Sequence, residues 1–132
     1  MSDVAGKAIW ITGASAGIGK GLALALAAQG ARLVLSGRNQ AALEEVAAQC
    51  PGSIVEAFEV TDLDLLPAIA ARVAAVTGGV DWLVNNAGIS QRSLALDTEF
   101  PVYRTLMEVD FFAPLRLTQL VLPAMEQRGS GR

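Results

Sequence analysis

Three glycines near the amino terminus have a spacing that suits the binding of an anion. Gly13, Gly17 and Gly19 lie in the segment Thr-Gly-Ala-Ser-Ala-Gly-Ile-Gly at 12–19, between a short apolar run and an amphipathic stretch. Such glycines permit a tight turn, close approach of the backbone to phosphate oxygens, and close packing of helix on strand. The N–H groups of the first helical turn then face an anion. A glycine-rich turn without a ligand is the alternative.

The pair Gly19-Lys20 also resembles the phosphate loop of nucleoside triphosphatases. That loop requires a glycine five residues before its second glycine and a Ser or Thr after the lysine. The chain has Ala14 and Gly21 at these positions, so the hydroxyl that binds magnesium is absent. The glycines therefore favour the pyrophosphate of a dinucleotide.

The residues after the second apolar run bear on which dinucleotide would bind. NAD sites usually place Asp or Glu about twenty residues past the glycines to hold the ribose 2′-hydroxyl. No carboxylate occurs in residues 33–42, where the run ends in Ser-Gly-Arg-Asn. Arg38 could instead form a charge-assisted hydrogen bond to a 2′-phosphate, helped by Ser15 or Asn39. NADP is favoured and NAD is the alternative; a solvated loop position is the competing interpretation of Arg38.

Short apolar runs alternate with amphipathic stretches, which predicts a βαβα order. Strands are expected at Ala8–Ile11, Arg32–Leu35, Ser53–Val55 and Val80–Val84, and helices at Gly17–Gln29, Gln40–Gln49 and about Leu65–Thr77. Asp64 is the expected N-cap of the third helix, and Pro67 is tolerated in its first turn. The expected fold is a doubly wound parallel Rossmann sheet of class α/β, with helices on both faces.

A longer helix is predicted from about Pro101 to Gln127. Its apolar stripe is expected to comprise Tyr103, Leu106, Met107, Phe111, Leu115, Thr118, Val121, Leu122 and Met125. Pro114 should kink this helix in its middle. Asp110 lies on the stripe, where an unpaired carboxylate is costly, which suggests that it has a use.

The spacing Thr-Gly-x-x-x-Gly-x-Gly, followed about seventy residues later by Asn85-Asn86-Ala87-Gly88, resembles the short-chain dehydrogenase/reductase family. Two ordered motifs are much more specific than either alone. The likeness spans essentially the whole chain, and in the segments Gly88–Thr98 and Leu115–Pro123 it is most similar to the dehydrogenase/reductase member 7 type within that family. The resemblance implies an oxidoreductase that transfers hydride between a nicotinamide and an alcohol or carbonyl substrate.

The same resemblance implies roles for particular residues. The first motif would wrap the pyrophosphate, the Asn-Asn-Ala-Gly turn would support the sheet beside the adenosine ribose, and Asp62 would lie against the adenine, close to Val60. A solvated carboxylate at a helix start is an equal alternative for Asp62. The expected cofactor-binding residues are Gly13, Ser15, Ala16, Gly17, Ile18, Gly19, Arg38, Asn39, Asp62, Asn86, Ala87 and Gly88.

The catalytic residues of the family are largely missing from the sequence. Relatives use a Tyr as general acid/base, a Lys that lowers its pKa, a Ser that holds the substrate oxygen, and an Asn in the long helix that anchors a water relay. Tyr103 is followed four residues later by Met107, so it does not fit this pattern and is expected in the core. Asp110 occupies the position of the Asn, but an ionised carboxylate cannot donate, which puts the relay in doubt. The alternative is a carboxylate that caps N–H groups near Pro114.

The composition limits the kinds of domain, partner and metal site that this chain can have. With 132 residues, 52% of them hydrophobic and 17% charged, the chain fits one soluble globular domain. The net charge is −3 and the basic residues are scattered, which argues against nucleic acid and anionic membranes. The chain has no histidine and one cysteine, Cys50, so no Cys/His metal site is expected. A cytoplasmic location is the default expectation.

Two functions from different classes stay open. The first is an NADP-dependent short-chain oxidoreductase represented by its cofactor-binding part, residues 1–132, with the sheet truncated after the fourth strand and the long helix. The second is a non-catalytic dinucleotide-binding or oligomerisation module that ends at Arg132. A sheet cut after its fourth strand exposes an edge. In relatives the 101–127 helix often pairs with its copy, so a homo-oligomer is expected.

Overall fold

Parallel strands joined by crossover helices make up the chain, which a computed structural model describes over residues 3–132. The strands are β1 (Ala8–Thr12), β2 (Arg32–Ser36), β3 (Ile54–Val55) and β4 (Trp82–Val84). The helices are α1 (Gly17–Ala28), α2 (Gln40–Ala47), α3 (Leu66–Thr77), α4 (Phe100–Met107) and α5 (Ala113–Arg128). A short 3₁₀ turn, η1 (Ala95–Asp97), precedes α4, and a π-helical segment, η2 (Glu108–Phe112), joins α4 to α5.

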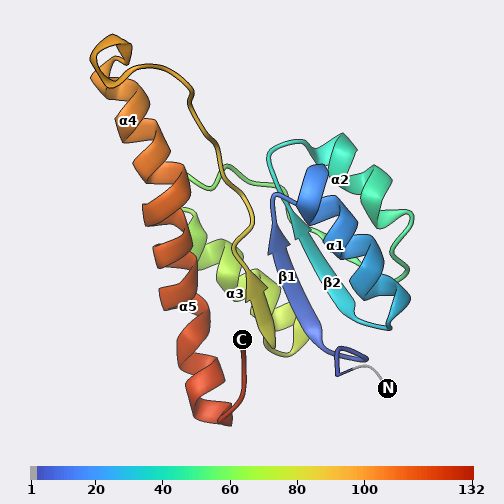
Figure 1. Ribbon diagram of the computed structural model, residues 1–132. Helices are drawn as coiled ribbons and strands as arrows, with labels where there is room; N and C mark the ends of the chain where they lie inside the picture. The colour runs from blue at the N-terminus through green and yellow to red at the C-terminus, as the bar shows by residue number, and fades with distance from the viewer. Residues whose placement is uncertain (1–2) are drawn as a thin grey trace.

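The sheet has the order β3-β2-β1-β4, and all neighbouring pairs are parallel. Trp10 in the central strand β1 stands opposite Val34 of β2 on one side and Leu83 of β4 on the other. Helices α1 and α2 cover one face of the sheet, and α3 and α5 cover the other, while α4 extends past the end of the sheet (Figure 1). The predicted doubly wound Rossmann sheet is therefore confirmed.

Each face of the sheet carries its own core because alternate residues of a strand point to opposite sides. Ile9, Ile11, Leu33 and Leu35 pack under α1 and α2. Trp10 packs against α3 and α5 on the opposite face and is fully buried. Its indole Nε1 donates a hydrogen bond of 2.8 Å to Ser36 Oγ, so the one polar group of the ring is satisfied inside the core.

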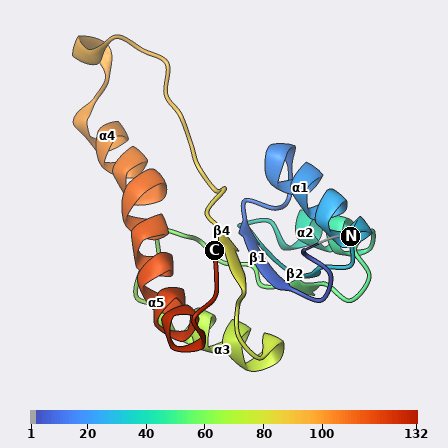
Figure 2. The ribbon, with the colours of Figure 1, turned by 60° about the horizontal axis from the view of Figure 1, so that its bottom comes forward.

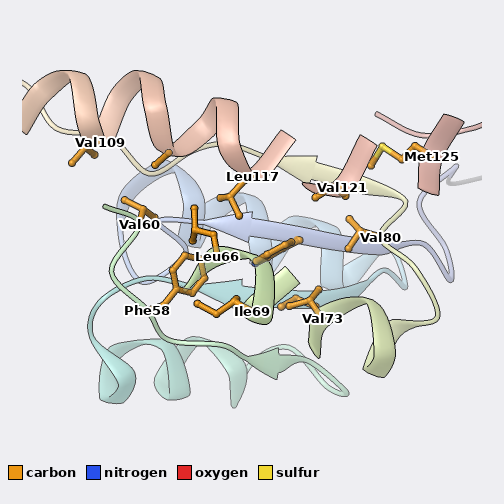
Figure 3. Packing of buried hydrophobic residues seen from close by; sticks show 13 residues of the cluster. Phe58, Val60, Leu66, Ile69, Val73, Val80, Val109, Leu117, Val121 and Met125 are labelled. Carbon is orange, nitrogen blue, oxygen red and sulfur yellow. The ribbon is translucent and has the colours of Figure 1, made fainter. Parts of the chain in front are cut away.

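The long helix packs through a face that differs from the predicted stripe. Its buried residues follow one another at four-residue intervals: Val109, Ala113, Leu117, Val121 and Met125. Figure 3 shows Val109, Leu117, Val121 and Met125 in this core. Only the last two belong to the predicted stripe. The other large apolar residues of that stripe are exposed, or half-buried in the case of Leu106: Tyr103, Met107, Phe111, Leu115 and Leu122. The helix is therefore apolar on two sides, one against the sheet and one outward.

Tyr103 is one of the residues on the outward side, so the expectation that it lies in the core is wrong. Its side chain is among the exposed large hydrophobics, with 37% of the residue accessible. The hydroxyl donates a hydrogen bond of 3.2 Å to the carbonyl of Ala95 in η1. Tyr103 thus fastens the loop after β4 to the start of the long helix.

Pro114 lies directly after the π-helical segment. Proline has no N–H and its ring crowds the carbonyl four residues earlier, which here belongs to Asp110. In η2 the backbone bonds span five residues, as from the N–H of Ala113 to the carbonyl of Glu108. The widened turn accommodates the proline, so the disturbance predicted at Pro114 takes the form of a π segment before it.

The start of α3 differs from the prediction as well. The N-cap is Leu65 rather than Asp64, and no side chain caps the helix. The N–H of Leu65 already bonds to the carbonyl of Asp62 at 3.1 Å, so a preceding turn leads the backbone into the helix without a capping carboxylate. Pro67 lies in the first turn, as predicted, and Gly78 ends the helix in the left-handed conformation with φ of 78°.

Three further features limit the chemistry of the described residues. Burial raises the pKa of the Cys50 thiol, so at neutral pH it is protonated and a poor nucleophile. Between residues 3 and 132 no cluster of three potential metal-binding side chains occurs. Within the same range none of the helices has the length and apolar character needed to span a bilayer.

Two adjacent leucines at the start of α3 offer a matched test of this core. Leu66 is fully buried (Figure 3), whereas its neighbour Leu65 is 51% exposed. Leu66→Ala should lower the free energy of unfolding by about 2–5 kcal/mol, because it removes buried methyl groups and leaves a cavity. Leu65→Ala should change it by less than about 1 kcal/mol. Urea denaturation followed by circular dichroism measures both values, and equal losses would contradict this packing.

Candidate functional site

The carboxyl ends of β1 and β4 are tied together by two side chains, Thr12 and Asn86. The buried hydroxyl Oγ1 of Thr12 accepts hydrogen bonds from the N–H groups of Asn86 at 3.1 Å and Ala87 at 3.0 Å. The side-chain Nδ2 of Asn86 donates to the carbonyls of Thr12 and Gly13, both at 3.1 Å. The turn after β4 therefore holds the point at which the glycine loop leaves β1.

The three glycines of the loop meet different constraints. A Cβ on Gly19 would collide with the carbonyl oxygen of Gly13 and with Nδ2 of Asn86. Gly13 has φ of +65°, and a Cβ there would lie 2.9 Å from the Ala87 backbone. Gly17 has φ of +55° and open space around it. Residue 19 is therefore glycine for close packing, residue 17 for its left-handed backbone conformation, and residue 13 for both reasons.

Among residues 3–132, no side chain caps the amino end of α1. Ala16 is the N-cap and offers no side-chain acceptor, and the first turn contains no acidic residue. The first amides of a helix have no partner within the helix. The N–H groups of residues 17–19 can therefore bind an external anion, and the helix dipole favours one at this place.

A cleft of about 470 Å³ lies beside this loop. It is bounded by the glycine loop, the end of β2, the segment after β3, the turn after β4 and the α4–η2 region. Its lining residues are Gly13, Ser15, Ala16, Gly37, Arg38, Phe58, Glu59, Val60, Thr61, Ala87, Gly88, Ile89, Thr105 and Val109. These segments meet at the carboxyl ends of the parallel strands, which is where open α/β sheets bind ligands.

The structure brings half of the predicted cofactor-binding residues to the cleft wall: Gly13, Ser15, Ala16, Arg38, Ala87 and Gly88. Asn86 lies behind this wall and holds the loop through the bonds described above. Gly17 and Ile18 are exposed at the start of α1, and Gly19, in the same helical turn, is buried.

The remaining two predicted residues lie elsewhere. The Asn39 side chain caps α2, because its Oδ1 accepts the N–H of Ala42 at 3.1 Å. Asp62 is exposed and does not line the cleft, whereas the preceding Val60 and Thr61 do. In the segment after β3, the residues that line the cleft therefore precede Asp62.

Arg38 and Glu59 face each other at the cleft. Nη1 of Arg38 lies 3.8 Å from Oε2 of Glu59, and the two side chains are 76% and 43% exposed. Sequence reasoning identified Arg38 from its position after β2 but missed Glu59, which belongs to the segment after the two-residue strand β3. The sequence did contain a signal for Glu59, because this carboxylate directly precedes Val60, which was already expected near the adenine.

Asp110 is exposed rather than placed on the buried face of the helix, which corrects the expectation that it lies on the apolar stripe. Its Oδ1 accepts the N–H of Ile89 at 2.9 Å. The alternative, a cap on groups near Pro114, is not the contact observed, since its partner lies in the loop after β4. This hydrogen bond, in which the carboxylate is the acceptor, connects η2 to the cleft wall at residues 88–89.

Arg132 lies beside β4 and forms hydrogen bonds to its outer edge. The N–H of Arg132 donates to the carbonyl of Asp81 at 3.0 Å, and its carbonyl accepts the N–H of Leu83 at 2.8 Å. This is the bonding pattern of parallel strands around Trp82. The guanidinium of Arg132 lies 5.0 Å from the centre of the Trp82 ring. Figure 2 shows the chain end next to β4, in the place of a neighbouring strand.

Comparison with known proteins identifies the class that this fold and cleft define. The family model described as short chain dehydrogenase matches residues 7–132. The chain belongs to the short-chain dehydrogenase/reductase family, whose members use NAD or NADP. Within that family it is of the dehydrogenase/reductase member 7 type, as its curated relatives indicate.

Among these relatives, dehydrogenase/reductase SDR family member 7B of Mus musculus is 41% identical over 129 residues, which is 92% of this chain and 40% of that protein. Member 7 of Homo sapiens is 41% identical over 132 residues, 94% of this chain and 39% of that protein. A crystal structure of a short-chain dehydrogenase from Streptomyces avermitilis superposes with a TM-score of 0.91 at 40% identity, covering 99% of this chain and 48% of the other. The chain thus spans about two fifths of the curated relatives' length.

Two glycines of α1 allow a matched test of the loop. Gly19→Ala should destabilise the protein strongly, because the new Cβ collides with the Gly13 carbonyl and the Asn86 side chain. Gly21→Ala meets nothing within 4 Å and should stabilise the helix by about 0.5–1 kcal/mol. Thermal denaturation of the two variants checks both signs. A Gly19→Ala variant as stable as Gly21→Ala would contradict the close contact of α1 with the β4 turn.

Proposed function

We propose that these residues form the cofactor-binding part of an NADP-dependent oxidoreductase that transfers hydride between a nicotinamide and an alcohol or carbonyl substrate. The observation that carries the proposal is the joint presence, at one cleft, of an uncapped helix start and the Asn86 turn that holds the glycine loop. Family membership adds that the dinucleotide is of the NAD(P) type. The nicotinamide, when bound, supplies or accepts the hydride.

The walls of the cleft fit the parts of such a dinucleotide. The free N–H groups of residues 17–19 would bind the pyrophosphate. Val60, Ala87 and Val109 offer apolar contact to an adenine ring. Arg38 is the one cation among the residues that line the cleft, and its planar guanidinium suits a 2′-phosphate. This last contact is the reason for favouring NADP over NAD.

Residues 1–132 do not contain the Tyr–Lys pair that moves the proton in relatives. Tyr103 is held by Ala95 and has no lysine in the family spacing, so no group in the chain matches the Tyr–Lys pair. Arg132 already lies in the position of a fifth strand, which is the strand that carries the catalytic Ser in relatives. We therefore expect the 132-residue chain alone to bind the dinucleotide without turnover, with Asp110 as a positioning group at most.

The choice of dinucleotide can be tested at Arg38. Arg38→Asp should weaken NADPH binding about 10- to 100-fold, because it replaces a phosphate-binding cation with a repelling anion. NADH, which has a neutral 2′-hydroxyl, should lose much less affinity. Fluorescence titration of the reduced nicotinamide measures both, and Arg104→Asp, an exposed position that does not line the cleft, is the control. Equal losses for the two dinucleotides would remove Arg38 from the site.

We also propose that the protein self-associates through the outward side of α4–α5. This surface, the outer apolar face, comprises Phe100, Tyr103, Met107, Phe111, Leu115 and Leu122, all of them exposed. Exposed apolar patches of this kind mark interfaces. A second copy of the same helix, packed about a two-fold axis, would cover the face with an identical one.

Placing a charge in the outer apolar face should break this association. Phe111→Glu would bury an unpaired carboxylate in the interface, and we expect the molecular mass in light scattering to fall toward that of the monomer. Gln127→Glu adds the same charge near the end of α5 and should leave the mass unchanged. If the wild type is already monomeric at micromolar concentration, the proposed interface is wrong.

A further inference from the structure

The cleft holds a second charged group that opposes Arg38. Among the residues lining it in the described part of the chain, Arg38 is the one cation and Glu59 the one carboxylate. They come from different strand ends, Arg38 after β2 and Glu59 after β3, and parallel pairing of these strands brings them together. Their charged atoms lie 3.8 Å apart.

We propose that Glu59 is a specificity-determining residue that restrains the preference for NADP set by Arg38. The inference rests on the proposed function, since it requires that a dinucleotide occupies this cleft. It gives a role to the Glu59 side chain, which has no part in the proposed function as stated above. The ratio of NADPH to NADH affinity then depends on the pair and not on Arg38 alone.

For NADPH, the carboxylate competes with the ligand. A phosphate monoester carries a charge between −1.5 and −2 at neutral pH and binds a guanidinium through two parallel hydrogen bonds. The Arg38 guanidinium is already shared with Glu59. Binding of the phosphate must displace the carboxylate or leave two anions near one cation. In either case Glu59 reduces the affinity that the contact between the 2′-phosphate and Arg38 adds.

For NADH, the carboxylate has the opposite effect. The ribose 2′-hydroxyl is neutral and is commonly held by an Asp or Glu that accepts its hydrogen bond. Glu59 is the acidic side chain that the described cleft offers for this contact. It would favour NADH by this hydrogen bond while it disfavours NADPH by charge.

The ion pair contributes little to the stability of the fold, so a change at Glu59 can be tested without unfolding the protein. The Arg38 side chain is 76% exposed and the Glu59 side chain 43%, and exposed ion pairs contribute little to stability. The main-chain carbonyl of Glu59 accepts the N–H of Asp62, and a change of side chain leaves this bond in place. Glu59→Gln should therefore fold as the wild type does, with the carboxylate replaced by a neutral amide of the same shape.

The experiment compares the dissociation constants of NADPH and NADH for the wild type and Glu59→Gln by fluorescence titration. We expect the constant for NADPH to fall about three- to tenfold, and that for NADH to stay or rise. Glu56→Gln is the matched control, because it removes the same charge three residues earlier, where the carboxylate pairs with Arg72 and does not line the cleft. Its ratio of the two constants should equal that of the wild type.

A second background tests the pairing with Arg38. In Arg38→Gln, the part of the effect that comes from releasing the guanidinium is lost, so Glu59→Gln should improve NADPH binding by a smaller factor than in the wild type. The inference is overturned if Glu59→Gln shifts the two constants equally, or if the factor is the same in both backgrounds. A wild type that binds neither dinucleotide would instead overturn the proposed function itself.

Discussion

The close approach of the β4 turn to the glycine loop is the constraint on which the cleft depends. Asn86 donates to two successive carbonyls at the end of β1, and Gly19 fits beneath them only because it has no side chain. This contact sets where the chain leaves β1 and how α1 begins. The amides of residues 17–19 are thereby held at one end of the sheet, pre-organised for an anion, and no side chain in the described part of the chain caps them.

The long α4–α5 helix carries out two packing tasks at once. Its inner side buries Leu117 and Val121 against the sheet, and its outer apolar face is left exposed. The π segment between α4 and α5 accommodates Pro114 and presents Asp110 to the backbone of Ile89. The same helix thus supports the core, holds one wall of the cleft through a single carboxylate, and offers a surface that a second copy could cover.

Charge in the cleft is balanced between two segments that are separate in the sequence. Arg38 follows β2 and Glu59 follows β3, and the register of these strands places the two groups opposite each other. Because both are partly solvated, neither is held by burial, and a bound anion could change their partners at low cost. This arrangement suits a site in which affinity for one dinucleotide over another is set by modest electrostatic differences.

The sequence by itself determined the order of strands and helices, the parallel sheet and the glycine loop, because periodicity and left-handed backbone positions are local properties. It also led to Arg38 and to the Asn86 turn, whose motif spacing is visible along the chain. It did not determine which side of the long helix is buried, since both sides are apolar and only the sheet selects one. The partner of Asp110, the capping role of Asn39 and the presence of Glu59 in the cleft were likewise decided by tertiary structure. Each depends on contacts between segments far apart in the chain, which no local pattern records.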